Sequence, residues 1–166
     1  MGRKNREKIL RIYFENPGKK FTVRELASGS SVPRSSVQVL LNELGSEGMI
    51  DKDRVPEDSI YFSVRKTNYF IEEIVRSGLI DYLVSELSPS VIILFGSFRK
   101  GDSNAGSDID LFVESYVDKS LDLSKYERRL KHKVDLFVEK DLGKINKTLF
   151  NNIINGVKLY GSFSVK

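Results

Sequence analysis

The sequence predicts an α+β protein in two parts, a mainly helical N-terminal part and a C-terminal part with a small mixed sheet. Apolar residues recur at helical spacing through residues 9–44, whereas short apolar segments at 91–95, 109–113 and 134–138 have the length and composition of strands. The net charge also differs between the two parts. Residues 1–66 hold 13 Lys and Arg against 9 Asp and Glu, whereas residues 67–166 hold 14 basic and 14 acidic residues. We therefore predict two domains, residues 1–66 and residues 67–166.

The sequence of the N-terminal part predicts three helices followed by a β-hairpin. The first helix ends at residues 16–18, the second begins at a capping box in residues 22–25, and the third begins near Pro33. Their apolar faces are formed by Ile9, Leu10, Tyr13 and Phe14 in the first helix and by Val37, Leu40, Leu41 and Leu44 in the third. Two strands, around residues 50–54 and 60–64, should follow, and helical spacing resumes over residues 67–87.

This order of elements, and the run of residues 31–50, resembles a winged helix-turn-helix domain. The resemblance implies that residues 1–66 bind double-stranded DNA, with the N-terminal end of the third helix in the major groove. Arg34 could contact guanine and Gln38 adenine, while serines hold phosphates. The candidate DNA contacts are Arg34, Ser35, Ser36 and Gln38 on the helix and Lys52 and Arg54 on the wing. The alternative is a module that binds protein or forms a homodimer.

The most informative segment is residues 96–110, which follows the apolar run 91–95. Asp108 and Asp110 lie two apart in a strand pattern, so their side chains share one face, roughly 7 Å apart along the chain. Two carboxylates on one face repel each other without a cation, and Mg²⁺ binds carboxylates while leaving positions for phosphate oxygens. The Gly96-Ser97 turn offers backbone N–H groups and a hydroxyl to phosphates. The pattern indicates metal-assisted nucleotidyl transfer.

Gly-Ser, ten residues and Asp-x-Asp resemble the signature of the DNA polymerase beta nucleotidyltransferase superfamily, and within it that of the minimal nucleotidyltransferases, the MNT family. Lys100 stands where the family usually has arginine, which keeps a cation but loses the fork geometry. The residues that match the motif are Gly96, Ser97, Gly101, Ser107, Asp108, Asp110 and Leu111. The resemblance implies that residues 67–166 comprise a linker helix and an MNT domain. It also implies nucleotide binding by Gly96, Ser97, Lys100 and Ser107.

Asp135 is the candidate third acid. Val134, Leu136 and Val138 alternate with it, as in a strand. If that strand lies beside residues 109–113, the spacing of about 4.8 Å between strands lets Asp135 reach the same metal site. The resemblance implies that Asp108, Asp110 and Asp135 are catalytic and bind two Mg²⁺ ions, with ATP as the expected nucleotide and AMP as the group transferred. The alternative is an edge-strand aspartate that faces water.

The acceptor is not encoded in any motif. MNT relatives often pair with a HEPN-domain protein, and some act as antitoxins that add AMP to the HEPN toxin. A fused winged helix would suit an antitoxin that represses its own operon. The competing hypothesis is a DNA-binding transcriptional regulator whose catalytically silent nucleotidyltransferase fold senses nucleotide. A small-molecule enzyme of the aminoglycoside-modifying type is disfavoured, because such enzymes carry extra helices for the acceptor.

The amino-acid composition excludes several kinds of site and of protein. The absence of cysteine excludes disulfides and thiolate metal sites, and a single histidine excludes multi-histidine zinc sites. The longest apolar runs are too short to cross a membrane, which favours the cytoplasm. His132 is expected to be a solvated loop residue, and the basic cluster of residues 125–133 a solvated helix face. The tail, residues 145–159, predicts a helix that covers the catalytic sheet, followed by a short strand at Leu159-Tyr160.

Overall fold

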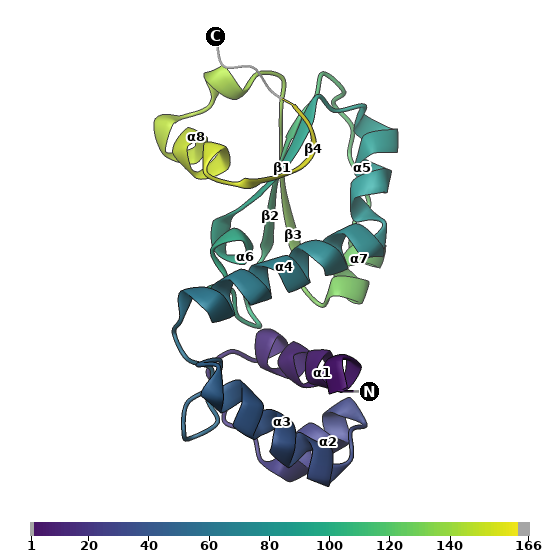
Figure 1. Ribbon diagram of the computed structural model, residues 1–166. Helices are drawn as coiled ribbons and strands as arrows, with labels where there is room; N and C mark the ends of the chain where they lie inside the picture. Colours follow the sequence, from purple (N-terminus) through teal and green to yellow (C-terminus); the bar gives the residue numbers. More distant parts are fainter. Residues whose placement is uncertain (1, 163–166) are drawn as a thin grey trace. The chain divides into compact units, whose positions relative to one another are not determined.

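The computed structural model describes residues 2–162 and divides the chain into two compact units, Met1–Tyr69 and Phe70–Lys166 (Figure 1). Helix α4, Ile60–Ser77, spans the division, so the chain passes from one unit to the other within a continuous helix. Among the described residues, no helix combines the length and apolar content needed to cross a membrane.

The first unit begins with three helices, as predicted: α1 Gly2–Glu15, α2 Val23–Ser30 and α3 Arg34–Ser46. The capping box at the start of α2 is present, since the Thr22 hydroxyl accepts from the Glu25 N–H at 3.2 Å and the Glu25 carboxylate accepts from the Thr22 N–H at 2.8 Å. The predicted apolar faces are buried and form the core, together with Leu26 of α2. The helical part of the N-terminal prediction is therefore confirmed.

The strand predicted around residues 50–54 is wrong. Only an isolated antiparallel bridge joins Ile50 to Pro56. Between them the Asp51 side chain accepts from the backbone N–H groups of Asp53 at 2.8 Å and Val55 at 2.9 Å, which closes a tight turn. An aspartate that bonds its own backbone in this way competes with a strand, so residues 51–55 form a loop.

The strand predicted at residues 60–64 is also wrong, because these residues begin α4. The Ser59 hydroxyl accepts from the Phe62 N–H at 3.1 Å and thereby caps the helix. Alternating Ile60, Phe62 and Val64 suggested a strand, but Ile60 is 86% exposed and Val64 is 50% exposed. The buried residues instead recur every fourth position, the spacing of one helix face: Phe62, Lys66, Phe70 and Ile74. Within the described residues, the β-hairpin of the predicted winged helix is therefore missing.

The second unit contains the predicted mixed sheet, with strand order β3-β2-β1-β4. Strand β1 is antiparallel to β2 and β4, whereas β2 and β3 are parallel. The strands are β1 Val91–Phe95, β2 Ile109–Glu114, β3 Val134–Glu139 and β4 Val157–Gly161. The helices around them are α5 Leu79–Leu87, α6 Gly96–Lys100, α7 Ser124–Leu130, the 3-10 turn η1 Leu142–Lys144 and α8 Lys147–Ile154. Figure 1 shows α5 on the side of the strands opposite to α8.

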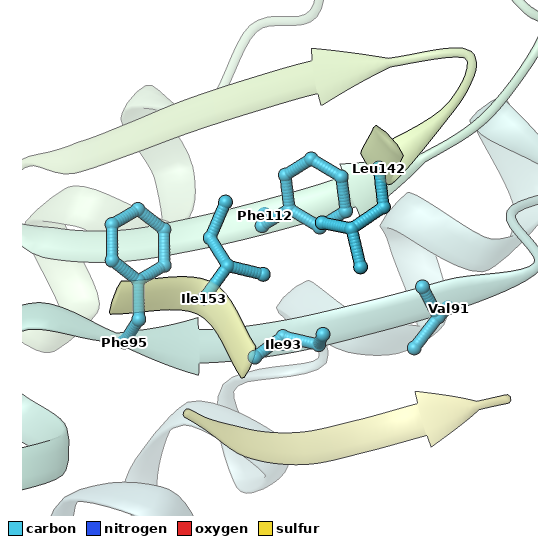
Figure 2. Close-up of a cluster of buried hydrophobic side chains, with 6 residues drawn as sticks. All are labelled: Val91, Ile93, Phe95, Phe112, Leu142 and Ile153. Carbon is cyan, nitrogen blue, oxygen red and sulfur yellow. The ribbon is translucent and has the colours of Figure 1, made fainter. Parts of the chain in front are cut away.

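One face of this sheet packs on the tail of the chain, as the sequence predicts. Figure 2 shows the buried cluster, whose members are Val91, Ile93, Phe95, Phe112, Leu142 and Ile153. The tail helix is shorter than predicted: it ends at Ile154, and Val157 begins strand β4. Phe95, at one end of the cluster, is the register partner of Asp110. The apolar core therefore ends where the carboxylates begin.

Candidate active site

The three candidate acids gather at one end of the sheet, where β1 ends and β2 and β3 begin. Asp110 of β2 and Asp135 of β3 are register partners in the parallel pair, so their side chains lie on the same face of neighbouring strands, about 4.8 Å apart across the ladder. Asp108 precedes Asp110 by two residues and lies just outside β2. Asp110 is half-buried, and Asp108 and Asp135 are exposed.

Asp110 lies against the Gly96-Ser97 turn. A Cβ atom on Gly96 would lie 1.9 Å from Asp110 Oδ2, and Gly96 has a φ of +67°. Both the backbone conformation and the space thus require glycine at this position. Strand β1 delivers the turn, because Phe95 is the last residue of β1 and pairs with Asp110. The structure thereby brings the predicted phosphate-binding turn into contact with one of the predicted acids.

The charges of the acids act on one another. The pKa of Asp110 is raised, first because burial disfavours its charged form and then because Asp135 and Asp108 add negative charge nearby. All three acids therefore contribute to one electrostatic cluster, which a bound cation would relieve.

The remaining nucleotide-binding candidates lie on the two segments that flank this cluster. Ser97 and Lys100 belong to α6; Ser97 is half-buried and Lys100 is exposed at the end of the helix. Ser107 stabilises its own loop, because its hydroxyl accepts from the Asn104 N–H at 2.9 Å and its N–H donates to the Asn104 carbonyl at 3.0 Å. The side chain of Ser107 therefore has a structural partner in addition to its predicted role.

A metal ion fits the chemistry of the acids. Among residues 2–162, no three His, Cys, Asp or Glu side chains are gathered closely enough to form a ready metal-binding group. Carboxylate oxygens are nevertheless the ligands that Mg²⁺ prefers, and the pKa of Asp110 is raised by burial first and then by the negative charges of Asp135 and Asp108. Asp108 and Asp135 are exposed, so their carboxylates are accessible to an ion from solvent.

The candidate DNA contacts fall in two places in the first unit. Four of them lie on the first turns of α3, which follows α2 after residues 31–33. Arg34, Ser35 and Gln38 are exposed and Ser36 is half-buried, while the Gln38 amide donates to Asn42 at 3.3 Å. The two wing candidates lie in the loop that replaces the predicted strand: Lys52 is exposed, and Arg54 is half-buried with a φ of +62°.

His132 is a residue whose place in the structure differs from the sequence prediction. It is half-buried, its Nδ1 lies 2.9 Å from the carbonyl oxygen of Ser107, and the rings of Phe98 and Phe70 pack edge-on against it. The prediction that it is solvated is therefore wrong. Since Ile109 pairs with Val134, extending the parallel register back by two residues brings His132 beside Ser107. The sequence of either segment does not specify this register, so no local signal placed His132 there.

The comparisons with known proteins address the second unit. The family model described as "Nucleotidyltransferase domain" matches residues 76–163. The matched segment includes all four strands, the Gly96-Ser97 turn and the three acids. No curated protein and no solved structure matches the chain significantly. This match covers more than half of the chain. The chain therefore belongs to the nucleotidyltransferase domain family.

Proposed function

We propose that the chain is a Mg²⁺-dependent nucleotidyltransferase of the MNT type, in the DNA polymerase beta superfamily, which moves AMP from ATP to a hydroxyl acceptor. The observation that carries the proposal is the contact between the Asp110 carboxylate and Gly96, with Asp135 in register beside Asp110. A phosphate-binding turn and a group of carboxylates in contact are the parts that nucleotidyl transfer requires.

In this proposal Asp108 and Asp110 hold one Mg²⁺, and together with Asp135 they hold a second. When bound, the ions supply charge neutralisation on the phosphates and lower the pKa of the acceptor hydroxyl. The Gly96-Ser97 turn binds phosphate oxygens through backbone N–H groups and the Ser97 hydroxyl, and Lys100 adds positive charge. The acceptor hydroxyl gives its proton to the Asp135 carboxylate, and its oxygen forms a bond to the α-phosphorus. The bond between that phosphorus and the bridging oxygen breaks, and pyrophosphate leaves.

For the first unit we propose a helix-turn-helix DNA-binding domain comprising residues 1–66, in which α3 contacts the major groove. The exposed Arg34, Ser35 and Gln38 on its first turns support this assignment. The loop of residues 51–55 takes the place of a wing and presents Lys52. Together the two units suit a cytoplasmic antitoxin that adds AMP to a HEPN-domain protein and represses its own operon.

The second candidate is a DNA-binding regulator whose nucleotidyltransferase fold only senses nucleotide. The observation that favours it is Lys100 in place of the arginine of the motif, because lysine cannot bind a phosphate in the bidentate manner of arginine. The transferase and the sensor differ in whether they turn nucleotide over into a product. The sensor predicts DNA affinity that changes with nucleotide while no labelled product forms, whereas the transferase predicts a labelled acceptor.

The transferase hypothesis is tested by mixing the purified protein with [α-³²P]ATP, Mg²⁺ and the HEPN-domain product of a neighbouring gene. The expected result is a stable complex and a radioactive HEPN band, which an Asp110→Asn variant does not produce. A complex without label favours the sensor, and failure to form a complex removes the HEPN partner from the proposal.

A further inference from the structure

His132 connects the three segments that carry the proposed site. Its ring packs edge-on against Phe98 of α6, with centroids 4.8 Å apart, and α6 begins with the Gly96-Ser97 turn. Its Nδ1 is 2.9 Å from the carbonyl oxygen of Ser107, the residue before Asp108. Two residues after it, β3 begins and leads to Asp135. The His132 side chain therefore contacts α6, which carries the Gly96-Ser97 turn, and Ser107, which precedes Asp108. It also lies just before β3, the strand that carries Asp135.

The orientation of the imidazole is defined. A carbonyl oxygen can only accept a hydrogen bond, so Nδ1 carries a hydrogen and donates a hydrogen bond to the Ser107 carbonyl oxygen. Phe98 is fully buried, and Phe70 supplies a second edge-on contact at 5.8 Å between centroids. Packing against two aromatic rings holds the imidazole in the plane that this hydrogen bond needs.

The bond to His132 adds to bonds that the loop before Asp108 makes within itself. Asn104 and Ser107 bond to each other, and Asn104 also accepts from the Gly106 N–H at 2.9 Å. The His132 contact and the bond from the Ile109 N–H to the Lys133 carbonyl, 2.8 Å, attach the end of this loop to the start of β3. These two bonds lie on either side of Asp108.

We propose that His132 is a positioning residue for the nucleotidyl-transfer site: through its hydrogen bond to Ser107 it holds the backbone of Asp108 and Asp110 in place, and so keeps Asp110 against the Gly96-Ser97 turn. This inference rests on the proposed function of the second unit. It assigns His132 no contact with substrate or metal, because its role is to hold the backbone that carries the acids. Removing a residue that orients metal ligands without touching the metal typically lowers metal affinity or activity by roughly 10- to 100-fold.

The test compares His132→Phe, which keeps an aromatic ring but removes the donor, with the matched control Tyr126→Phe. Tyr126 is a buried aromatic residue of α7 that packs on Tyr82, and its substitution likewise removes one polar group from a ring. Hydrogen exchange of the metal-free proteins is measured by mass spectrometry. In His132→Phe, residues 102–110 should exchange roughly tenfold faster, the scale of one lost hydrogen bond, while residues 91–95 are unchanged. Tyr126→Phe should leave residues 102–110 unchanged.

A second measurement concerns the site itself. In the transfer assay, His132→Phe should lower kcat and raise the Mg²⁺ concentration for half-maximal rate, each about tenfold, with the KM for ATP changed less. His132→Asn should restore much of both, because the Asn side-chain nitrogen occupies the same position along the side chain as Nδ1. If His132→Phe does not fold, His132→Asn is compared with His132→Leu, which has similar size and no donor.

Two exchange results would overturn the inference. The first is unchanged exchange in residues 102–110 when the donor is absent, and the second is equally faster exchange in residues 91–95, which marks a general packing role. The exchange measurement needs no turnover. A wild-type protein that transfers no nucleotide therefore refutes the proposed function, whereas an active His132→Phe protein with wild-type Mg²⁺ dependence refutes the positioning role.

Discussion

Asp110 is at the centre of the site, because it touches the Gly96 backbone and is surrounded by like charge. Its raised pKa means that the folded, metal-free protein binds a proton at this carboxyl more readily than the unfolded chain does. The stability contribution of this group is therefore fully present below the ordinary pKa of an aspartate, which the unfolded chain keeps, and is lost as the pH rises through the raised pKa of the folded protein. At neutral pH the charged carboxylate destabilises the metal-free fold.

Asp110→Asn should accordingly raise the melting temperature of the metal-free protein at pH 7. The gain should be small, about 1–3 °C, because water screens a carboxylate that is only half-buried. It should disappear near pH 4, and Mg²⁺ should raise the melting temperature of the wild type but not of the variant. Calorimetry in EDTA and in Mg²⁺ measures this. A variant that is less stable at pH 7 than the wild type would contradict the raised pKa of Asp110 and the destabilising charge that it implies.

At the scale of elements, the sequence was sufficient where a motif or a cap constrains the chain locally. Strands β1 and β2 and the capped helix α2 were predicted because their signals lie within a few residues. The start of α4 was missed because three alternating apolar residues fit a strand over so short a span, and only Ser59 and the buried face continuing to Ile74 identify the helix.

Some features of the site could likewise be predicted from local sequence signals, and others could not. The grouping of the acids follows from the strand pattern, although their catalytic roles remain predictions. The Asp110–Gly96 contact and the bond from His132 to Ser107 depend on the registers of β1 with β2 and of β2 with β3. Register between segments so far apart in the chain is not specified by either segment alone, so sequence reasoning could not place these contacts.

The turn between β1 and α6 is the element that we expect to tolerate least change. Gly96→Ala places a Cβ against Asp110 Oδ2 and forces alanine into a left-handed conformation, which costs roughly 1–2 kcal/mol for the backbone alone. We expect lower stability in urea unfolding and loss of nucleotidyl transfer.

Gly106→Ala is the matched control for this substitution. Its Cβ would come no nearer than 3.5 Å to Asn104 Oδ1, and Gly106 does not have a positive φ. It should change stability by less than about 0.5 kcal/mol and keep activity. Equal effects of the two substitutions would contradict the special role of the Gly96 position.

At the scale of the whole molecule, the two units have separate predicted tasks. If α3 contacts DNA, Arg34→Ala should weaken binding to the DNA upstream of its own gene by about tenfold or more, the effect of losing one base contact. Arg76→Ala is the control, since Arg76 is an exposed arginine of the second unit that pairs with Glu72. Fluorescence anisotropy at several salt concentrations measures both. If both variants bind like the wild type, α3 is not the DNA-contacting element, and a protein-binding role for the first unit gains support.

The carboxylates at the start of β2 are expected to carry out nucleotidyl transfer. The most direct measurement incubates the wild type, Asp108→Asn, Asp110→Asn and the control Asp118→Asn with [α-³²P]ATP, Mg²⁺ and a host-cell lysate. Asp118 is an exposed acid in the loop beyond the other end of β2. We expect a labelled protein or RNA band with the wild type and Asp118→Asn, and a band reduced by about 100- to 1,000-fold in the other two variants. Full labelling by Asp108→Asn or Asp110→Asn, or no labelling by the wild type, would contradict it.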